Sequence, residues 1–135
     1  MLTHPKSAFH LSLPGVVAVL LTGLSAAAFA AADPAQEVAT AATHAGFAAQ
    51  ASAIEQVHMH LHHTINCLVG PKGHGFDANE ANPCQKLGDG AIPDTADAAA
   101  RAKLSKALAD AEAGLKSNDL TAAKKAAAEA QSNLK

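Results

Sequence analysis

Four of the eight histidines in this 135-residue chain occur within six consecutive positions, in the segment QVHMHLHHTINC. They are His58, His60, His62 and His63. Imidazole nitrogens bind borderline divalent metals such as copper, zinc, nickel and cobalt. So dense a cluster predicts a metal site, and the alternative is a polar helix surface that is rich in histidine.

The geometry of the cluster depends on the secondary structure that carries it. Apolar residues at positions 57, 59 and 61 alternate with His58, His60 and His62. On a strand, this alternation would place the three imidazoles on one face. We favour a helix, because apolar residues at spacings of three and four continue before and after the segment and the preceding sequence is rich in alanine.

On a helix, residues three and four positions apart are neighbours. Glu55, His58 and His62 would then share one flank and offer a carboxylate and two imidazoles to a single ion. Histidines at positions i and i+4 chelate borderline divalent metals well. These three residues are therefore the first candidate ligand set.

Further candidate ligands lie nearby. Met59 pairs with His63 and His60 also pairs with His63, each at helical spacing. A thioether adds some preference for copper and divalent copper tops the affinity series, so copper is expected first, followed by zinc, nickel or cobalt. His44 would lie about four turns earlier on a continuous helix, too far to join the ion at His58 directly. His74 would have to fold back from the following loop, and both it and His44 are kept as additional candidates.

One long helix is predicted over residues 37–68. Its apolar stripe runs at alternating spacings of three and four, and no proline follows Pro34 within it. Asp33 and Pro34 are a natural start, since an N-cap residue precedes a proline in the first turn. Gly70 and Pro71 are a natural stop.

A loop is predicted over residues 70–93, where glycine, proline, asparagine and aspartate dominate. The chain has two cysteines, Cys67 and Cys84, and in an exported protein we expect them to form a disulfide. On the chain-entropy model, such a bond stabilises the fold by about 3 kcal/mol. Metal ligation by the thiolates is the less favoured alternative, because an oxidising compartment removes them.

Two alanine-rich helices are predicted after the loop. The first starts at Asp94 or Thr95 and runs to about Lys116, and the second follows a turn at residues 117–119 and reaches about residue 134. Small residues permit close helix approach, so these two should form an antiparallel hairpin packed on the first helix. The expected fold is all-α, a small helical bundle formed by one domain over residues 33–135.

Residues 1–30 have the features of a signal peptide. Lys6 precedes an apolar run over residues 11–24, and Ala28-Phe29-Ala30 provides the small residues that signal peptidase requires, with an alternative cut after Ala32. The run is shorter than the roughly 20 apolar residues of a membrane-spanning helix. We therefore expect a periplasmic or secreted protein that has no membrane span after cleavage.

The composition excludes several classes of function. The net charge is −2 and no segment is basic enough to indicate nucleic-acid binding. Motifs for covalent haem, metalloproteases, serine hydrolases and phosphate binding are lacking, and Glu55-x-x-His58 has no second copy to complete a di-iron site, so no enzyme is predicted.

With no tryptophan or tyrosine and few large apolar residues, the core should be thin. A disulfide, a metal or a partner chain would then complete it.

The export signal, the histidine-rich helix and the hairpin sequence AEAGLKSNDLTAAKKAAAEAQSNL together resemble small periplasmic histidine-rich metal-binding proteins built as helical bundles. This resemblance implies a metal buffer or scavenger without catalysis. The chain departs from that pattern because its histidines crowd into one helix and none follows His74, whereas those proteins spread them along all helices. One or two ions are therefore expected per chain.

Two functions are compatible with these observations. The first is a periplasmic metal-binding protein that buffers, scavenges or delivers copper or a similar divalent ion. The second is a non-catalytic interaction module, whose thin core is completed by a second copy or by a periplasmic protein partner.

Overall fold

The computed structural model describes residues 31–135, and the predicted signal peptide lies outside this part of the chain. The described residues form helices without strands, which confirms the predicted all-α fold. The helices are α1 (Pro34–Gln50), α2 (Ile54–Val69), the single-turn α3 (Ala91–Asp94), α4 (Ala98–Lys116) and α5 (Leu120–Asn133).

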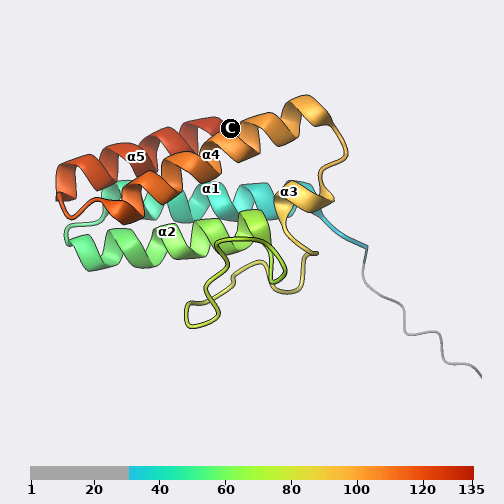
Figure 1. The fold of residues 1–135 in the computed structure, drawn as a ribbon, viewed down its shortest axis with the longest axis horizontal. Helices are drawn as coiled ribbons and strands as arrows, with labels where there is room; N and C mark the ends of the chain where they lie inside the picture. The colour runs from blue at the N-terminus through green and yellow to red at the C-terminus, as the bar shows by residue number, and fades with distance from the viewer. Residues whose placement is uncertain (1–30) are drawn as a thin grey trace, which may run out of the picture.

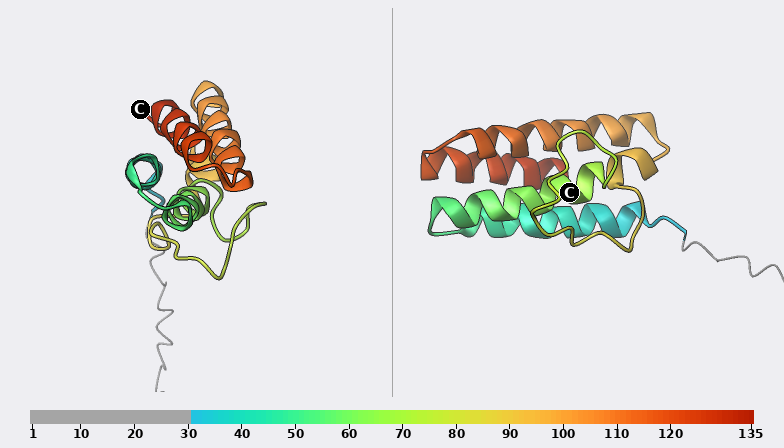
Figure 2. Two further views of the ribbon diagram at one scale, coloured as in Figure 1. Left: turned by 90° about the vertical axis from the view of Figure 1, so that its left-hand side faces the viewer. Right: turned by 60° about the horizontal axis from the view of Figure 1, so that its bottom comes forward.

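The four long helices form a bundle of two antiparallel hairpins (Figure 1). Helix α1 packs against α2 and α5, and α4 packs against α5 and α2. The end-on view in Figure 2 shows the resulting square arrangement. No helix among residues 31–135 has both the length and the apolar character that crossing a membrane requires.

The prediction of one continuous helix over residues 37–68 is wrong. The chain leaves the helix at Ala51 (φ −61°, ψ 150°) and re-enters it after Ala53 (φ −131°, ψ 147°), and α2 then runs back beside α1. Helices gain most of their stability from packing an apolar face. The apolar stripe that predicted one long helix is divided between two shorter helices that bury it against each other.

Alanine is the most frequent residue type in the buried core. Fully buried alanines line three of the helices: Ala41, Ala45 and Ala48 on α1, Ala107 and Ala111 on α4, and Ala123, Ala127 and Ala130 on α5. The larger buried aliphatic side chains come mainly from α2: Val57, Leu61, Ile65, Leu68 and Val69. Helix α2 therefore supplies the bulk of the core, and the small faces of the other helices close around it.

Three aspartates cap the N-termini of α1, α4 and α5. The side chains of Asp33, Asp97 and Asp119 each accept a hydrogen bond from a backbone N–H three residues later, at 2.7–3.0 Å. The predicted start at Asp33 and Pro34 is confirmed. The predicted start of the second helix at Asp94 or Thr95 is a few residues early, because the short α3 occupies residues 91–94 within the predicted loop and Asp97 caps α4.

The loop between α2 and α3 is tied to the bundle at two points. The predicted Cys67–Cys84 disulfide is confirmed, and both cysteines are buried. The buried Asn66 accepts a hydrogen bond from the N–H of Asp77 (2.9 Å) and donates to the carbonyls of Asp77 (2.9 Å) and Ala81 (3.1 Å). This part of the loop is consequently held against α2, and most of the loop lies below the α1–α2 layer in Figure 1.

Candidate metal centre

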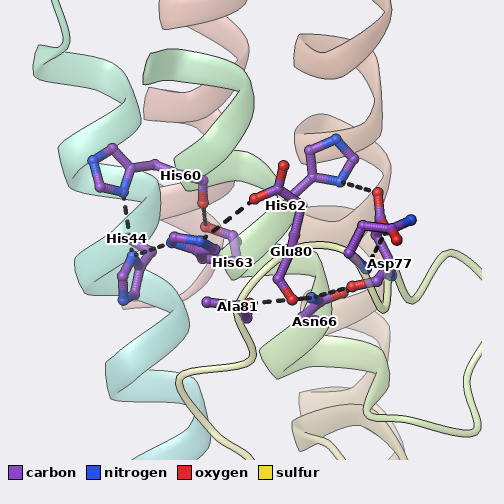
Figure 3. A network of polar contacts seen from close by, with 10 residues as sticks. His44, His60, His62, His63, Asn66, Asp77, Glu80 and Ala81 are labelled. Carbon is purple, nitrogen blue, oxygen red and sulfur yellow. Dashed lines mark hydrogen bonds and ion pairs between the residues drawn. The ribbon is translucent and has the colours of Figure 1, made fainter. Parts of the chain in front are cut away.

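Three histidines from two helices converge between α1 and α2 (Figure 3). His44 comes from α1, and His60 and His63 come from α2. One ring nitrogen of each lies within 4.8 Å of one from each of the others, and these three form the one such group of His, Cys, Asp or Glu side chains in residues 31–135. We call His44, His60 and His63 the histidine triad.

Two of the three nitrogen separations in the triad match the coordination sphere of a small metal ion, and the third, between His60 and His63, is within 4.8 Å. The Nδ1 atom of His44 lies 3.4 Å from the Nδ1 of His60 and 3.4 Å from the Nδ1 of His63. Nitrogens bound at about 2.0–2.1 Å to a tetrahedral zinc ion are about 3.4 Å apart. An ion could therefore bind the three rings with little rearrangement.

The helical hairpin explains why these residues meet. His60 and His63 are three positions apart on α2, so their side chains are neighbours. The chain reverses around Ser52, and residues equally far from a reversal lie opposite each other across the hairpin. His44 is eight positions before Ser52 and His60 is eight positions after it. A buried hydroxyl joins the helices beside them, since Thr64 Oγ1 lies 2.9 Å from the His60 carbonyl and 3.4 Å from that of Ala41.

An aromatic side chain covers part of the triad. The ring of Phe47 packs edge-on against His44, with ring centroids 5.7 Å apart, and lies 5.3 Å from the centroid of His60. Phe47 is itself about half exposed (49%). It forms an apolar shield on one side of the triad, which limits the access of water to the imidazoles.

Burial keeps two of the three rings neutral. Desolvation, together with weaker repulsion from His63 and His60, lowers the pKa of His44 to about 4. Desolvation also lowers the pKa of His63, with His60 acting in the same sense and the Glu80 carboxylate opposing it. Neutral imidazole is the form that binds metal. His44 and His63 are therefore in the metal-binding form at neutral pH.

The close approach of the ring nitrogens has a chemical consequence. Two lone pairs do not face each other favourably at 3.4 Å, so each contact needs a shared proton or a cation. In a neutral imidazole one nitrogen carries the proton and the other accepts. Coordination through Nδ1 requires the proton to be on Nε2 in each ring. An ion would thus take the place of the protons between the rings.

One side of the triad opens into a pocket of about 660 Å³. His44 and His63 line it together with side chains from the disulfide-tied loop: Phe76, Ala78, Glu80, Ala81, Asn82, Pro83 and Gln85. Glu80 Oε2 lies 3.8 Å from Nε2 of His63. The pocket provides a route for an ion, and three protein ligands leave a coordination position free for a further ligand.

The first candidate ligand set is not assembled in the structure. The ring of His58 donates a hydrogen bond from Nε2 to the carbonyl of Ser117 (2.9 Å), in the turn between α4 and α5. His62 Nδ1 instead lies 3.7 Å from Asp77 Oδ2, and Glu55 is exposed in the first turn of α2. These three residues share a flank of the helix, but their functional atoms have other neighbours or face solvent.

The remaining candidates divide into two groups. Met59 and His74 are exposed and lie outside the triad. The pair His60 and His63 is brought together, as the helical spacing predicts. His44 was expected to lie too far from the ion at His58 on a continuous helix, but the break at residues 51–53 brings it against His60 and His63 instead. No glycine or proline marks the reversal at residues 51–53, so the sequence offered no turn signal that could have placed His44 opposite His60.

Comparison of the chain with protein-family models, with curated proteins and with solved structures finds no significant match.

Proposed function

We propose that this protein binds a single transition-metal ion through His44, His60 and His63 and buffers or delivers that ion in the periplasm. The observation that supports this proposal is the spacing of the ring nitrogens, 3.4 Å from His44 to each partner, which suits an ion bound by imidazole. The periplasmic location rests on the signal-peptide features of residues 1–30.

The ligand chemistry favours copper or zinc over harder ions. Three imidazoles suit copper, zinc, nickel and cobalt, whereas magnesium and calcium prefer oxygen ligands. Divalent copper has the highest affinity in the series, so copper is the first candidate.

Reversible binding fits this ligand set better than permanent storage. All three ligands are neutral when they bind, so no ligand charge neutralises the ion. The pocket beside His44 and His63 leaves one side of the ion accessible. An accessible ion with a free coordination position can be transferred to another ligand, which is the step that buffering and delivery require.

The test compares the histidine triad with the first candidate ligand set, which is Glu55, His58 and His62. Titration of Cu(II) and Zn(II) against a chromophoric chelator should give one site in the wild type and a large loss of affinity in H44A. The double variant H58A/H62A is the matched control, because it also removes imidazoles from α2 but leaves the triad intact. Wild-type affinity in H44A, with a loss in H58A/H62A, would contradict the proposal.

A further inference from the structure

We propose that Glu80 is a positioning residue for the metal site, which fixes the tautomer and orientation of His63. This inference rests on the proposed metal-binding function of the histidine triad. It assigns to the disulfide-tied loop a direct part in metal affinity.

The two nitrogens of the His63 ring face different partners. Nδ1 lies 3.4 Å from Nδ1 of His44, and Nε2 lies 3.8 Å from Oε2 of Glu80. An ionised carboxylate accepts hydrogen bonds and donates none. Glu80 therefore favours the tautomer that carries its proton on Nε2, and this tautomer leaves the Nδ1 lone pair free for an ion.

Such a carboxylate is a common partner of metal-binding histidine. A histidine ligand usually donates its second N–H to a carboxylate, a carbonyl or water, which orients the ring and makes it more basic. The contact at 3.8 Å is longer than a direct hydrogen bond and within the range of an ion pair. A bound cation would strengthen it, because it increases the positive charge on the ring N–H.

The loop holds Glu80 in place from both sides. The buried Asn66 donates to the carbonyls of Asp77 and Ala81, which flank Glu80 in the sequence. The N–H of Glu80 also donates to the carbonyl of Asp77 (3.3 Å), and the disulfide anchors Cys84 shortly afterwards. Figure 3 shows the Glu80 side chain reaching from this loop toward His63. The position of the carboxylate is consequently set by the loop.

The same loop contains an internal control. Asp77 Oδ2 lies 3.7 Å from Nδ1 of His62, which is nearly the same contact between a loop carboxylate and an α2 histidine. His62 lies outside the triad. Removing the charge of Asp77 therefore tests the general effect of a lost carboxylate, whereas removing that of Glu80 tests the effect on a metal ligand.

The experiment compares E80Q with D77N in the full mature chain. The affinity for Zn(II) and Cu(II) is measured by chelator competition, and the tautomer of His63 in the metal-free protein is measured from its ¹⁵N imidazole shifts by NMR. We expect E80Q to weaken metal binding by about 10–100-fold and to lower the population of the Nε2–H tautomer of His63. We expect D77N to retain both wild-type values.

The outcomes separate this inference from the proposed function. Wild-type affinity and an unchanged His63 tautomer in E80Q, while H44A loses binding, would overturn the role of Glu80 alone. Failure of the wild type to bind either metal would overturn both proposals. The tautomer is read from folded protein, so a change in it cannot be attributed to a loss of stability in E80Q.

Discussion

At the scale of single residues, the fold contains ionisable groups whose burial shifts their pKa values in opposite directions. Glu37 is fully buried, and its Oε1 accepts a hydrogen bond from the N–H of Gly90 (3.1 Å). Burial, with a smaller contribution from the nearby Asp94, outweighs the Gly90 bond and raises the pKa of Glu37 to about 7. The buried His44 and His63 have lowered pKa values. The acid is thus favoured in its protonated form and the two bases in their neutral form.

The raised pKa of Glu37 predicts a loss of stability at neutral pH. Since the folded-state pKa lies above the ordinary value of 4.5, the contribution of Glu37 is fully present below pH 4.5 and is lost as the pH rises through about 7. At about 1.4 kcal/mol per pH unit, the loss is on the order of 3 kcal/mol. E37Q stays neutral and can still accept from Gly90, so it should be more stable than the wild type at pH 8. Urea unfolding from pH 4 to 8 measures this, and parallel profiles for the two proteins would contradict it.

The lowered pKa of His44 predicts metal binding that resists acid. Protons compete with a metal for an unperturbed imidazole below about pH 6.5. For His44, this competition should begin only near its pKa of about 4. The apparent affinity for zinc should therefore fall less between pH 7 and 5.5 than for a site of exposed histidines. A peptide carrying the exposed pair His-x-x-x-His is the reference in the same chelator titration. An equally steep decline in both would show that the rings are not protected from protons.

At the scale of secondary-structure elements, what the sequence predicts is local. Helical periodicity, the Asp33 cap, the turn at residues 117–119 and the Cys67–Cys84 disulfide follow from spacing and residue type. The reversal at residues 51–53 does not, because both halves of the apparent helix share one apolar period. It results from packing the alanine face of α1 against the aliphatic face of α2, which is a property of the tertiary structure.

In the candidate site too, local contacts could be predicted from the sequence and contacts between elements could not. His60 and His63 could be paired from their spacing, since neighbours on one helix are visible in the sequence. His44 could not be added to them, because it meets them across the hairpin. Glu80 could not be identified either, since its position depends on the loop bonds to Asn66. Contacts between elements therefore account for most of what the sequence interpretation missed.

The disulfide should matter to both stability and metal binding. The double variant C67A/C84A removes a link across 17 positions of the sequence, which should lower the free energy of unfolding by about 3 kcal/mol. It should also weaken metal binding, because the loop that carries Glu80 becomes less restrained. Urea unfolding and chelator competition measure the two effects. Unchanged metal affinity in a folded C67A/C84A protein would show that the disulfide is not needed to hold Glu80 in place.

At the scale of the whole molecule, a metal should act as part of the core. The bundle relies on alanine faces and few large side chains, so a ligand that joins α1 to α2 should have a clear effect. A ligand that binds only the folded state stabilises it by about 2.7 kcal/mol at a hundredfold excess over its dissociation constant. The melting temperature should thus rise with Cu(II) or Zn(II) at pH 7.5 in the wild type and remain unchanged in H44A. An interaction module would instead show a melting temperature that rises with protein concentration and not with metal.

The position of the ion can be measured directly by anomalous diffraction from a crystal of the zinc-loaded protein. The histidine triad predicts one strong anomalous peak between α1 and α2, at about 2.0–2.1 Å from a ring nitrogen of His44, His60 and His63. A peak at His58 and His62 without one at His44, or no ordered zinc on α2 at all, would contradict the proposed site.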